Sequence, residues 1–183
     1  TDEAPVGATI RTGIGAAGPV TVPADRYTSL DFAALEHERL WPRVWQLACT
    51  VDHVAEPGSV FDYRLADRSV LIARGQDGEL RGFENVCLHR GSELCPGSAS
   101  GLDELRCPYH RWGWDLTGRL REVPSRKGFG VLPPEDYALR SVAVDTWGPL
   151  VFVHPGPADG DHPSLTEFLG EVPGDVAWAG LDD

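Results

Sequence analysis

Four cysteine and histidine side chains, grouped in two short pairs, constrain this chain more than any other feature. Cys87 and His89 are separated by one residue, and Cys107 and His110 by two. The seventeen residues between the pairs, 90–106, are rich in Gly, Ser and Pro, which is typical of loops. Two loops that each supply one thiolate and one imidazole can hold a metal centre between them, and these ligands suit zinc or iron–sulfur centres.

The order of the ligands along the chain bears on which of these two centres is present. Zinc fingers usually present two cysteines and then two histidines, whereas here each pair contains one of each. That order fits a two-iron cluster in which two thiolates hold one iron and two imidazoles hold the other. A zinc site, or a chance grouping of four core residues, is the alternative interpretation.

The pattern Cys-x-His, seventeen residues, Cys-x-x-His resembles the Rieske motif, and Gly91, Tyr109 and Trp112 stand where that family has glycine and aromatic residues. Respiratory Rieske proteins have one more cysteine in each loop and join the loops by a disulfide. Ser92 and Tyr109 occupy those positions here, so that disulfide cannot form. CLHRG and CPYHRW instead resemble the N-terminal Rieske domain of ring-hydroxylating, Rieske-type non-haem iron oxygenases. That family most often has glycine where this chain has Arg111.

The resemblance implies a set of ligands for a [2Fe–2S] cluster. Cys87 and Cys107 would hold the buried iron, which stays ferric. His89 and His110 would hold the outer iron, which cycles between ferric and ferrous, with their free ring nitrogens as the electron exit. Three further residues would surround the cluster: Arg90, Arg111 and Trp112, the last as part of a shielding wall.

The resemblance also implies a function and partners. A reductase or ferredoxin would deliver single electrons through the cluster to a mononuclear non-haem iron(II), held by two histidines and a carboxylate in a catalytic domain. No such ligand run follows residue 110, so we expect that iron in a domain outside this chain. The partners would be the catalytic domains of the same and a neighbouring subunit in a homotrimer. The chain would therefore be part of an oxidoreductase and would lack the oxygenase site.

A stand-alone Rieske ferredoxin, which only carries electrons, is the alternative function. The sequence predicts a helix over about residues 28–41, followed by a tryptophan-led strand over residues 44–50. This arrangement resembles the lead-in of oxygenase large subunits, and a stand-alone Rieske ferredoxin normally lacks it. We therefore favour the oxygenase interpretation.

The remaining sequence predicts a mainly β protein. Short alternating or β-rich runs at 59–66, 69–75 and 79–86 are separated by turn residues. Turns are expected at Asp77-Gly78, at Thr117-Gly118 and at Gly148-Pro149. We expect a Rieske-type antiparallel β sandwich with two cluster-binding hairpin loops and short helices near both ends.

Helix signals support the two terminal helices. Thr28 and Asp31 have capping-box spacing at the start of a helix that Pro42 would end. Ser164 and Glu167 have the same spacing before a second short helix. In the cluster half, Trp112 and Trp114 alternate and are expected on opposite faces of a strand.

Composition sets the domain organisation and the expected location. Residues 1–22 mix Gly, Ala, Pro and Thr without periodicity and predict a flexible arm, and residues 23–183 predict one Rieske domain. No apolar run approaches the roughly 20 residues of a membrane span. Cys49 and Cys95 are left over from the motif, and we interpret both as reduced, which fits a cytoplasmic protein.

The distribution of charge also bears on partners. The net charge of −12 argues against nucleic acid, which binds mainly through cationic contacts. Residues 81–127 nevertheless contain eight basic and six acidic side chains, so half of the sixteen basic residues surround the motif. This asymmetry predicts a docking face for an acidic electron donor. Arginines that only border the strands are the alternative explanation.

Overall fold

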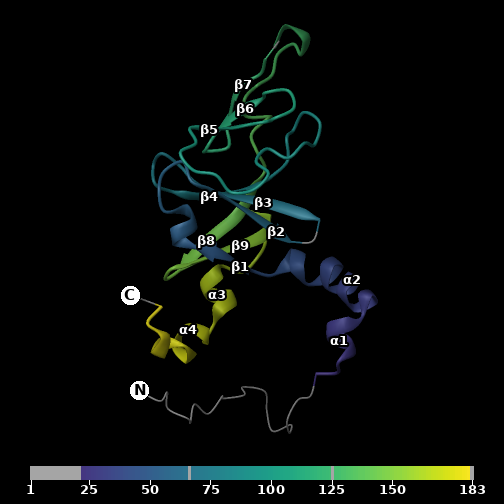
Figure 1. Ribbon diagram of the computed structural model, residues 1–183, viewed down its shortest axis with the longest axis vertical. Helices are drawn as coiled ribbons and strands as arrows, with labels where there is room; N and C mark the ends of the chain where they lie inside the picture. Colours follow the sequence, from purple (N-terminus) through teal and green to yellow (C-terminus); the bar gives the residue numbers. More distant parts are fainter. Residues whose placement is uncertain (1–21, 66, 125, 182–183) are drawn as a thin grey trace. The chain divides into compact units, whose positions relative to one another are not determined.

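The computed structural model describes residues 22–65, 67–124 and 126–181, so the predicted arm lies outside it except for Val22. The chain divides into two units, residues 1–34 and 35–183. In the first unit, helix α1 (Asp25–Thr28) precedes the beginning of α2 (Leu30–Arg39). The Arg26 guanidinium lies 4.5 Å from the centroid of the Phe32 ring, a cation–π contact. All the described strands belong to the second unit (Figure 1).

The second unit contains two antiparallel sheets, which confirms the mainly β prediction. The larger sheet has the order β1-β9-β8-β4-β3-β2, and the smaller has the order β5-β6-β7. The strands of the larger sheet are β1 (Gln46–Thr50), β2 (Val60–Leu65), β3 (Arg68–Arg74), β4 (Leu80–Glu84), β8 (Ser141–Trp147) and β9 (Leu150–Pro157). Those of the smaller sheet are β5 (Glu104–Arg106), β6 (Gly113–Asp115) and β7 (Leu120–Glu122).

The three predicted turns join neighbouring strands. Residues 77–78 connect β3 to β4, residues 117–118 connect β6 to β7, and residues 148–149 connect β8 to β9. Besides lying in a turn, Gly118 allows a close approach to strand β4, because a Cβ at this position would come within 2.5 Å of the Phe83 ring. The tip of the β6–β7 hairpin therefore packs directly on strand β4 of the larger sheet.

Helix α2 begins one residue later than its predicted cap. The Ser29 hydroxyl accepts a hydrogen bond from the Phe32 N–H at 3.2 Å, so Ser29 caps the helix and the prediction of Thr28 was wrong. Thr28 is the last residue of α1, and its hydroxyl donates back to the Ala24 carbonyl at 3.4 Å. The helix ends before Pro42, as predicted, and a 3₁₀ turn, η1 (Trp41–Arg43), leads into β1.

The C-terminal helices follow β9. Ser164 and Glu167 form the predicted capping box at the start of α3 (Leu165–Leu169). The short helix α4 (Val172–Asp175) and the 3₁₀ turn η4 (Ala177–Ala179) come next. The remaining 3₁₀ turns are η2 (Val51–Val54) and η3 (Arg126–Gly128). None of the helices in the described part of the chain is long and apolar enough to cross a bilayer.

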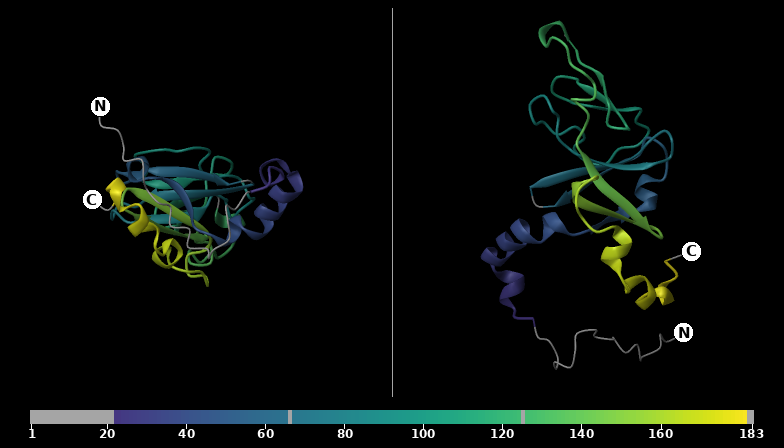
Figure 2. Two further views of the ribbon diagram at one scale, coloured as in Figure 1. Left: turned by 90° about the horizontal axis from the view of Figure 1, so that it is seen from below. Right: turned by 180° about the vertical axis from the view of Figure 1, so that it is seen from behind.

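The main core lies between the two sheets. It joins Leu71 and Phe83 of the larger sheet to Leu105 and Trp114 of the smaller one. Trp114 is fully buried, and its indole N–H donates to the Tyr137 carbonyl at 2.8 Å. Figures 1 and 2 show the smaller sheet and its loops at one end of the larger sheet, with α3 and α4 at the opposite end. The loops that carry the motif thus rest on a rigid base.

Candidate metal centre

The first motif pair lies on a loop that follows β4 and is closed by its own backbone. The Gly91 N–H donates to the Cys87 carbonyl, and the Cys87 N–H donates to the Ser92 carbonyl, both at 2.8 Å. Gly91 has φ 70°, a left-handed conformation that glycine adopts without strain. The loop therefore positions its thiol and imidazole through local hydrogen bonds.

The second pair lies on a loop between β5 and β6 with the same hydrogen bonds. The Arg111 N–H donates to the Cys107 carbonyl at 3.0 Å, and the Cys107 N–H donates to the Trp112 carbonyl at 2.8 Å. Arg111 has φ 63° and so repeats the conformation of Gly91, at a cost of about 1 kcal/mol for a residue with a Cβ. It is the only non-glycine residue with positive φ in the described part of the chain. Its carbonyl accepts from the Arg106 guanidinium at 3.1 Å, which holds the loop in this conformation.

The two motif thiols meet in the core. Cys87 and Cys107 are 2% and 1% exposed and lie within hydrogen-bond contact of each other. Burial raises the pKa of Cys87, and the neighbouring Cys107 raises it further. Burial also acts to raise the pKa of Cys107, but the N–H groups of His110 and Tyr109 and the Ser92 hydroxyl outweigh it and lower that pKa. The surroundings of Cys107 therefore favour its thiolate, the form that binds metals.

The two motif imidazoles lie beside one another. The ring centroids of His89 and His110 are 4.7 Å apart, and the ring planes are inclined by 66°. The Nδ1 atom of His89 is buried and has no hydrogen-bond partner. Burial lowers the pKa of His89, as do the positive charges of His110 and Arg90, and this favours the neutral imidazole that binds metals. A buried nitrogen without a partner is costly unless a ligand satisfies it.

Aromatic side chains pack against both imidazoles. Trp112 is buried and stacks on His89, with centroids 5.0 Å apart and planes only 2° from parallel. Phe129 packs edge-on against the rings of His89 and Trp112, with centroid distances of 5.5 Å and 5.4 Å. The Tyr109 ring lies 3.8 Å from that of His110 and is 62% exposed. The geometry therefore covers His89 more than His110.

Trp112 and Trp114 do not lie on opposite faces of a strand, so that prediction was wrong. Strand β6 begins at Gly113, so Trp112 belongs to the loop and strand alternation does not apply to it. Both rings are buried in the same core, with centroids 6.1 Å apart.

A buried polar network supports the first loop from behind. The Asn85 carbonyl oxygen accepts from the N–H groups of Leu94 and Cys95 at 2.9 and 3.1 Å. Its amide nitrogen donates to the Cys95 carbonyl at 2.8 Å and to the Ser69 hydroxyl at 2.9 Å. Ser69 in turn donates to the carboxylate of Asp62. Asn85 therefore ties the chain before the loop to the chain after it.

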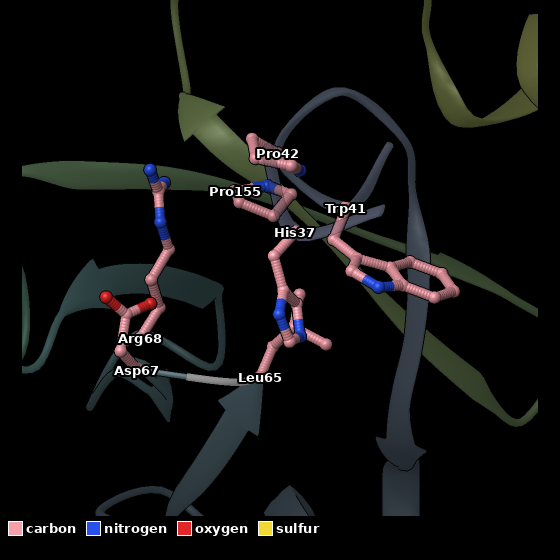
Figure 3. Close-up of a pocket in the computed structure, with 7 residues that line it drawn as sticks. All are labelled: His37, Trp41, Pro42, Leu65, Asp67, Arg68 and Pro155. Carbon is pink, nitrogen blue, oxygen red and sulfur yellow. The ribbon is translucent and has the colours of Figure 1, made fainter. Parts of the chain in front are cut away.

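The remaining cysteines and histidines lie elsewhere. No disulfide joins any of the four cysteines, so Cys49 and Cys95 are free thiols as predicted, and the Cys95 thiol donates to the Gly97 carbonyl at 3.1 Å. Burial raises the pKa of Cys49 to about 11, so this thiol is unreactive. Figure 3 shows exposed His37 beside a cavity of about 20 Å³, which has room for about one water molecule. None of the four motif residues lines this cavity.

The donor set fits a two-iron cluster better than a single metal ion. A structural zinc site needs four donors that converge on one point. Within the described ranges, no three His, Cys, Asp or Glu side chains are placed to hold one ion. A [2Fe–2S] cluster needs only two donors for each iron, and the loops present a pair of thiols and a pair of imidazoles.

Comparison with protein families shows that this chain belongs to the Rieske [2Fe-2S] domain family, whose model matches residues 44–143. A Rieske domain binds a [2Fe–2S] cluster. The chain is 34% identical over 146 residues to 2-aminobenzenesulfonate 2,3-dioxygenase subunit alpha of Alcaligenes sp., which covers 75% of this chain and 35% of the relative. It is also 34% identical over 133 residues to a chloroplastic choline monooxygenase of Spinacia oleracea, with coverage of 73% and 30%. The chain thus spans about a third of the length of these curated relatives.

Solved structures give the same result. The apo form of a quaternary ammonium Rieske monooxygenase superposes with a TM-score of 0.76 at 25% identity, over 88% of this chain and 47% of that one. Naphthalene 1,2-dioxygenase from Rhodococcus sp. gives a TM-score of 0.70 at 29% identity, over 78% and 32%. The domain is therefore homologous to the N-terminal Rieske domains of oxygenase alpha subunits, which favours the oxygenase interpretation over a stand-alone ferredoxin.

Proposed function

We propose that this chain transfers single electrons to the mononuclear iron of a Rieske non-haem iron oxygenase. The observation that carries the proposal is the meeting of two buried thiols and two adjacent imidazoles, one of which has a buried nitrogen with no partner. When bound there, a [2Fe–2S] cluster supplies one-electron redox chemistry. The relatives named above are oxygenases, which points to oxygenase chemistry as the destination of the electron.

Each residue of the site has a role in this proposal. Cys87 and Cys107 supply the thiolates on the core side, and His89 and His110 supply the imidazoles. Trp112 and Phe129 exclude water from His89, which keeps the surroundings of the centre rigid and of low polarity. His110 is flanked by an exposed tyrosine and is therefore the imidazole from which the electron leaves toward the acceptor.

The partners we propose are a reductase or ferredoxin as electron donor and the catalytic domains of the same and a neighbouring subunit, in a homotrimer. One solved relative is described as revealing inter-subunit electron transfer, which supports a partner subunit here. The two cysteines outside the motif, Cys49 and Cys95, are free thiols, which supports a reducing location, and we propose the cytoplasm.

Iron and acid-labile sulfide analysis of the purified protein tests the proposal. We expect a red-brown protein with two irons and two sulfides for each chain. Cys87→Ser and His110→Ala should lose the colour, whereas Cys95→Ser and His37→Ala should keep it, because those side chains lie outside the centre. A colourless protein that contains zinc would refute the proposal.

A further inference from the structure

A group of ion pairs lies on one face of the smaller sheet. The Arg106 guanidinium of β5 binds the carboxylates of Glu104 on its own strand and Glu122 on β7, each at 2.6 Å. Arg106 lies opposite Gly113 of β6, which in turn lies opposite Glu122. Residues opposite one another in a sheet share a face, so the guanidinium reaches across Gly113. A Cβ at Gly113 would lie 3.2 Å from the Glu104 carboxylate and 3.5 Å from the guanidinium, so glycine leaves room for the bridge.

The same guanidinium also binds the second motif loop, residues 107–112. Its Nη1 atom donates to the Arg111 carbonyl at 3.1 Å, while Nε and Nη2 donate to Glu104 and Glu122. The Arg106 side chain is only 23% exposed. Arginine presents its donors in a rigid planar fork, so the two carboxylates fix the direction of the third bond. The sheet therefore supports the loop at the Arg111 carbonyl.

Arg111 needs this support more than a glycine would. Its φ of 63° is strained for a residue with a Cβ, whereas Gly91 has the same conformation in the first loop without strain. In this conformation the Arg111 N–H reaches the Cys107 carbonyl at 3.0 Å and closes the loop. His110 directly precedes Arg111, so a change in the Arg111 backbone would turn the His110 imidazole relative to the Cys107 thiol.

We propose that Arg106 is a positioning residue for the imidazole of His110 and acts through the backbone of Arg111. This inference rests on the proposed function, in which His110 is a cluster ligand and the electron exit. The ion pairs with Glu104 and Glu122 hold the guanidinium on the sheet, and its bond to the Arg111 carbonyl keeps the strained turn closed. Arg106 and Arg111 thus act as a pair, because the loop has no glycine at position 111. Groups around a metal ligand that fix its orientation also tune the metal.

Hydrogen exchange of the second motif loop, measured by mass spectrometry, tests the pairing in a double-mutant cycle. We expect Arg106→Gln to speed exchange of residues 107–112 by about tenfold, the effect of one lost hydrogen bond from a charged group. In an Arg111→Gly background the same substitution should change exchange by less than about twofold, because glycine keeps the turn without support. Equal acceleration in both backgrounds would overturn the inference.

Arg81→Gln is the matched control. Arg81 binds the Asp77 carboxylate at 2.7 Å, and its side chain is 29% exposed, close to the value for Arg106. This pair lies at the β3–β4 turn and makes no bond to the second motif loop in the described part of the chain. Exchange of residues 107–112 should therefore be unchanged in Arg81→Gln. Equal acceleration by Arg81→Gln and Arg106→Gln would show a general loss of stability and overturn the inference.

Pulsed electron paramagnetic resonance of the cluster-loaded variants separates positioning from stability. Arg106→Gln should change the hyperfine coupling of one imidazole nitrogen and leave the other unchanged, and Arg111→Gly in the same chain should restore the original value. A change in both couplings, or in neither, would overturn the positioning role. Failure of the proposed function has a different result, since the unaltered protein would then hold no cluster, and the exchange cycle would alone decide whether Arg106 supports the loop.

Discussion

At the scale of single residues, the first motif loop depends on the hydrogen bonds of one buried side-chain amide. Asn85 makes four hydrogen bonds around the first loop, and it is 1% exposed. Buried polar groups that lose their partners cost roughly 1–3 kcal/mol each, because water cannot replace the lost bond. The position of Cys87, two residues further on, therefore depends on this amide.

Asn85→Ala should lower the free energy of unfolding by about 3 kcal/mol, since it leaves the N–H groups of Leu94 and Cys95 without an acceptor. We also expect faster loss of the cluster, measured by the decay of visible absorption in urea. Gln76→Ala is the control, because Gln76 is exposed and makes a single 3.3 Å hydrogen bond. Equal stability of the two variants would contradict the role of Asn85.

At the scale of elements, the two motif loops have the same backbone conformation but carry different residues at one matching position. Gly91 and Arg111 share a left-handed backbone, but only arginine has a Cβ that strains it. Arg111→Gly should therefore raise the free energy of unfolding by about 1 kcal/mol, and Gly91→Ala should lower it by about 1 kcal/mol. Urea denaturation of the two variants measures both effects, and changes of the same sign would show that the loops are not equivalent.

Two histidine rings stack where β9 leads into the C-terminal helices. His154 is buried and stacks on His162 at 4.2 Å, and Trp45 contacts both rings. Burial lowers the pKa of His154 from its usual 6.5, as does the charge of His162, whereas the Arg43 carbonyl opposes the shift. Below pH 6.5 the unfolded chain therefore binds a proton that the folded chain excludes, so stability is present above this pH and is lost as the pH falls.

We expect the free energy of unfolding to fall below pH 6.5 by up to about 1.4 kcal/mol for each pH unit on account of His154. His154→Asn should show a shallower dependence in urea titrations from pH 7 to 5. His37→Asn, which alters an exposed histidine of α2, should keep the original dependence. Parallel curves for all three proteins would contradict the assignment to His154.

At the scale of the whole molecule, the smaller sheet and the motif loops lie at one end of the larger sheet, and helices α3 and α4 lie at the other (Figure 1). The main core reaches from β2 and β3 to the motif cysteines themselves, so the thiols are part of the hydrophobic core. The imidazoles of His89 and His110 are only partly buried, and they pack against Trp112 and Tyr109. Rigid support on one side and access on the other are what an electron-transfer centre needs.

The sequence predicts local features of this molecule better than distant contacts. The Ser164 capping box and the three strand-joining turns depend on neighbouring residues, and each is found as predicted. The Thr28 cap was wrong because adjacent Ser29 offers the same hydroxyl in an extended conformation. Phe129 was not predicted, since its contact with His89 joins segments forty residues apart and no local pattern marks it.

Pulsed electron paramagnetic resonance of the chemically reduced protein tests the central claim most directly, because it detects nitrogen bound to a paramagnetic cluster. The account predicts hyperfine couplings from two imidazole nitrogens, which assign His89 and His110 as ligands, and a midpoint potential near the low end of the Rieske range, about −150 mV. A cluster signal without nitrogen couplings, or a potential near −400 mV as in clusters held only by cysteine, would contradict it.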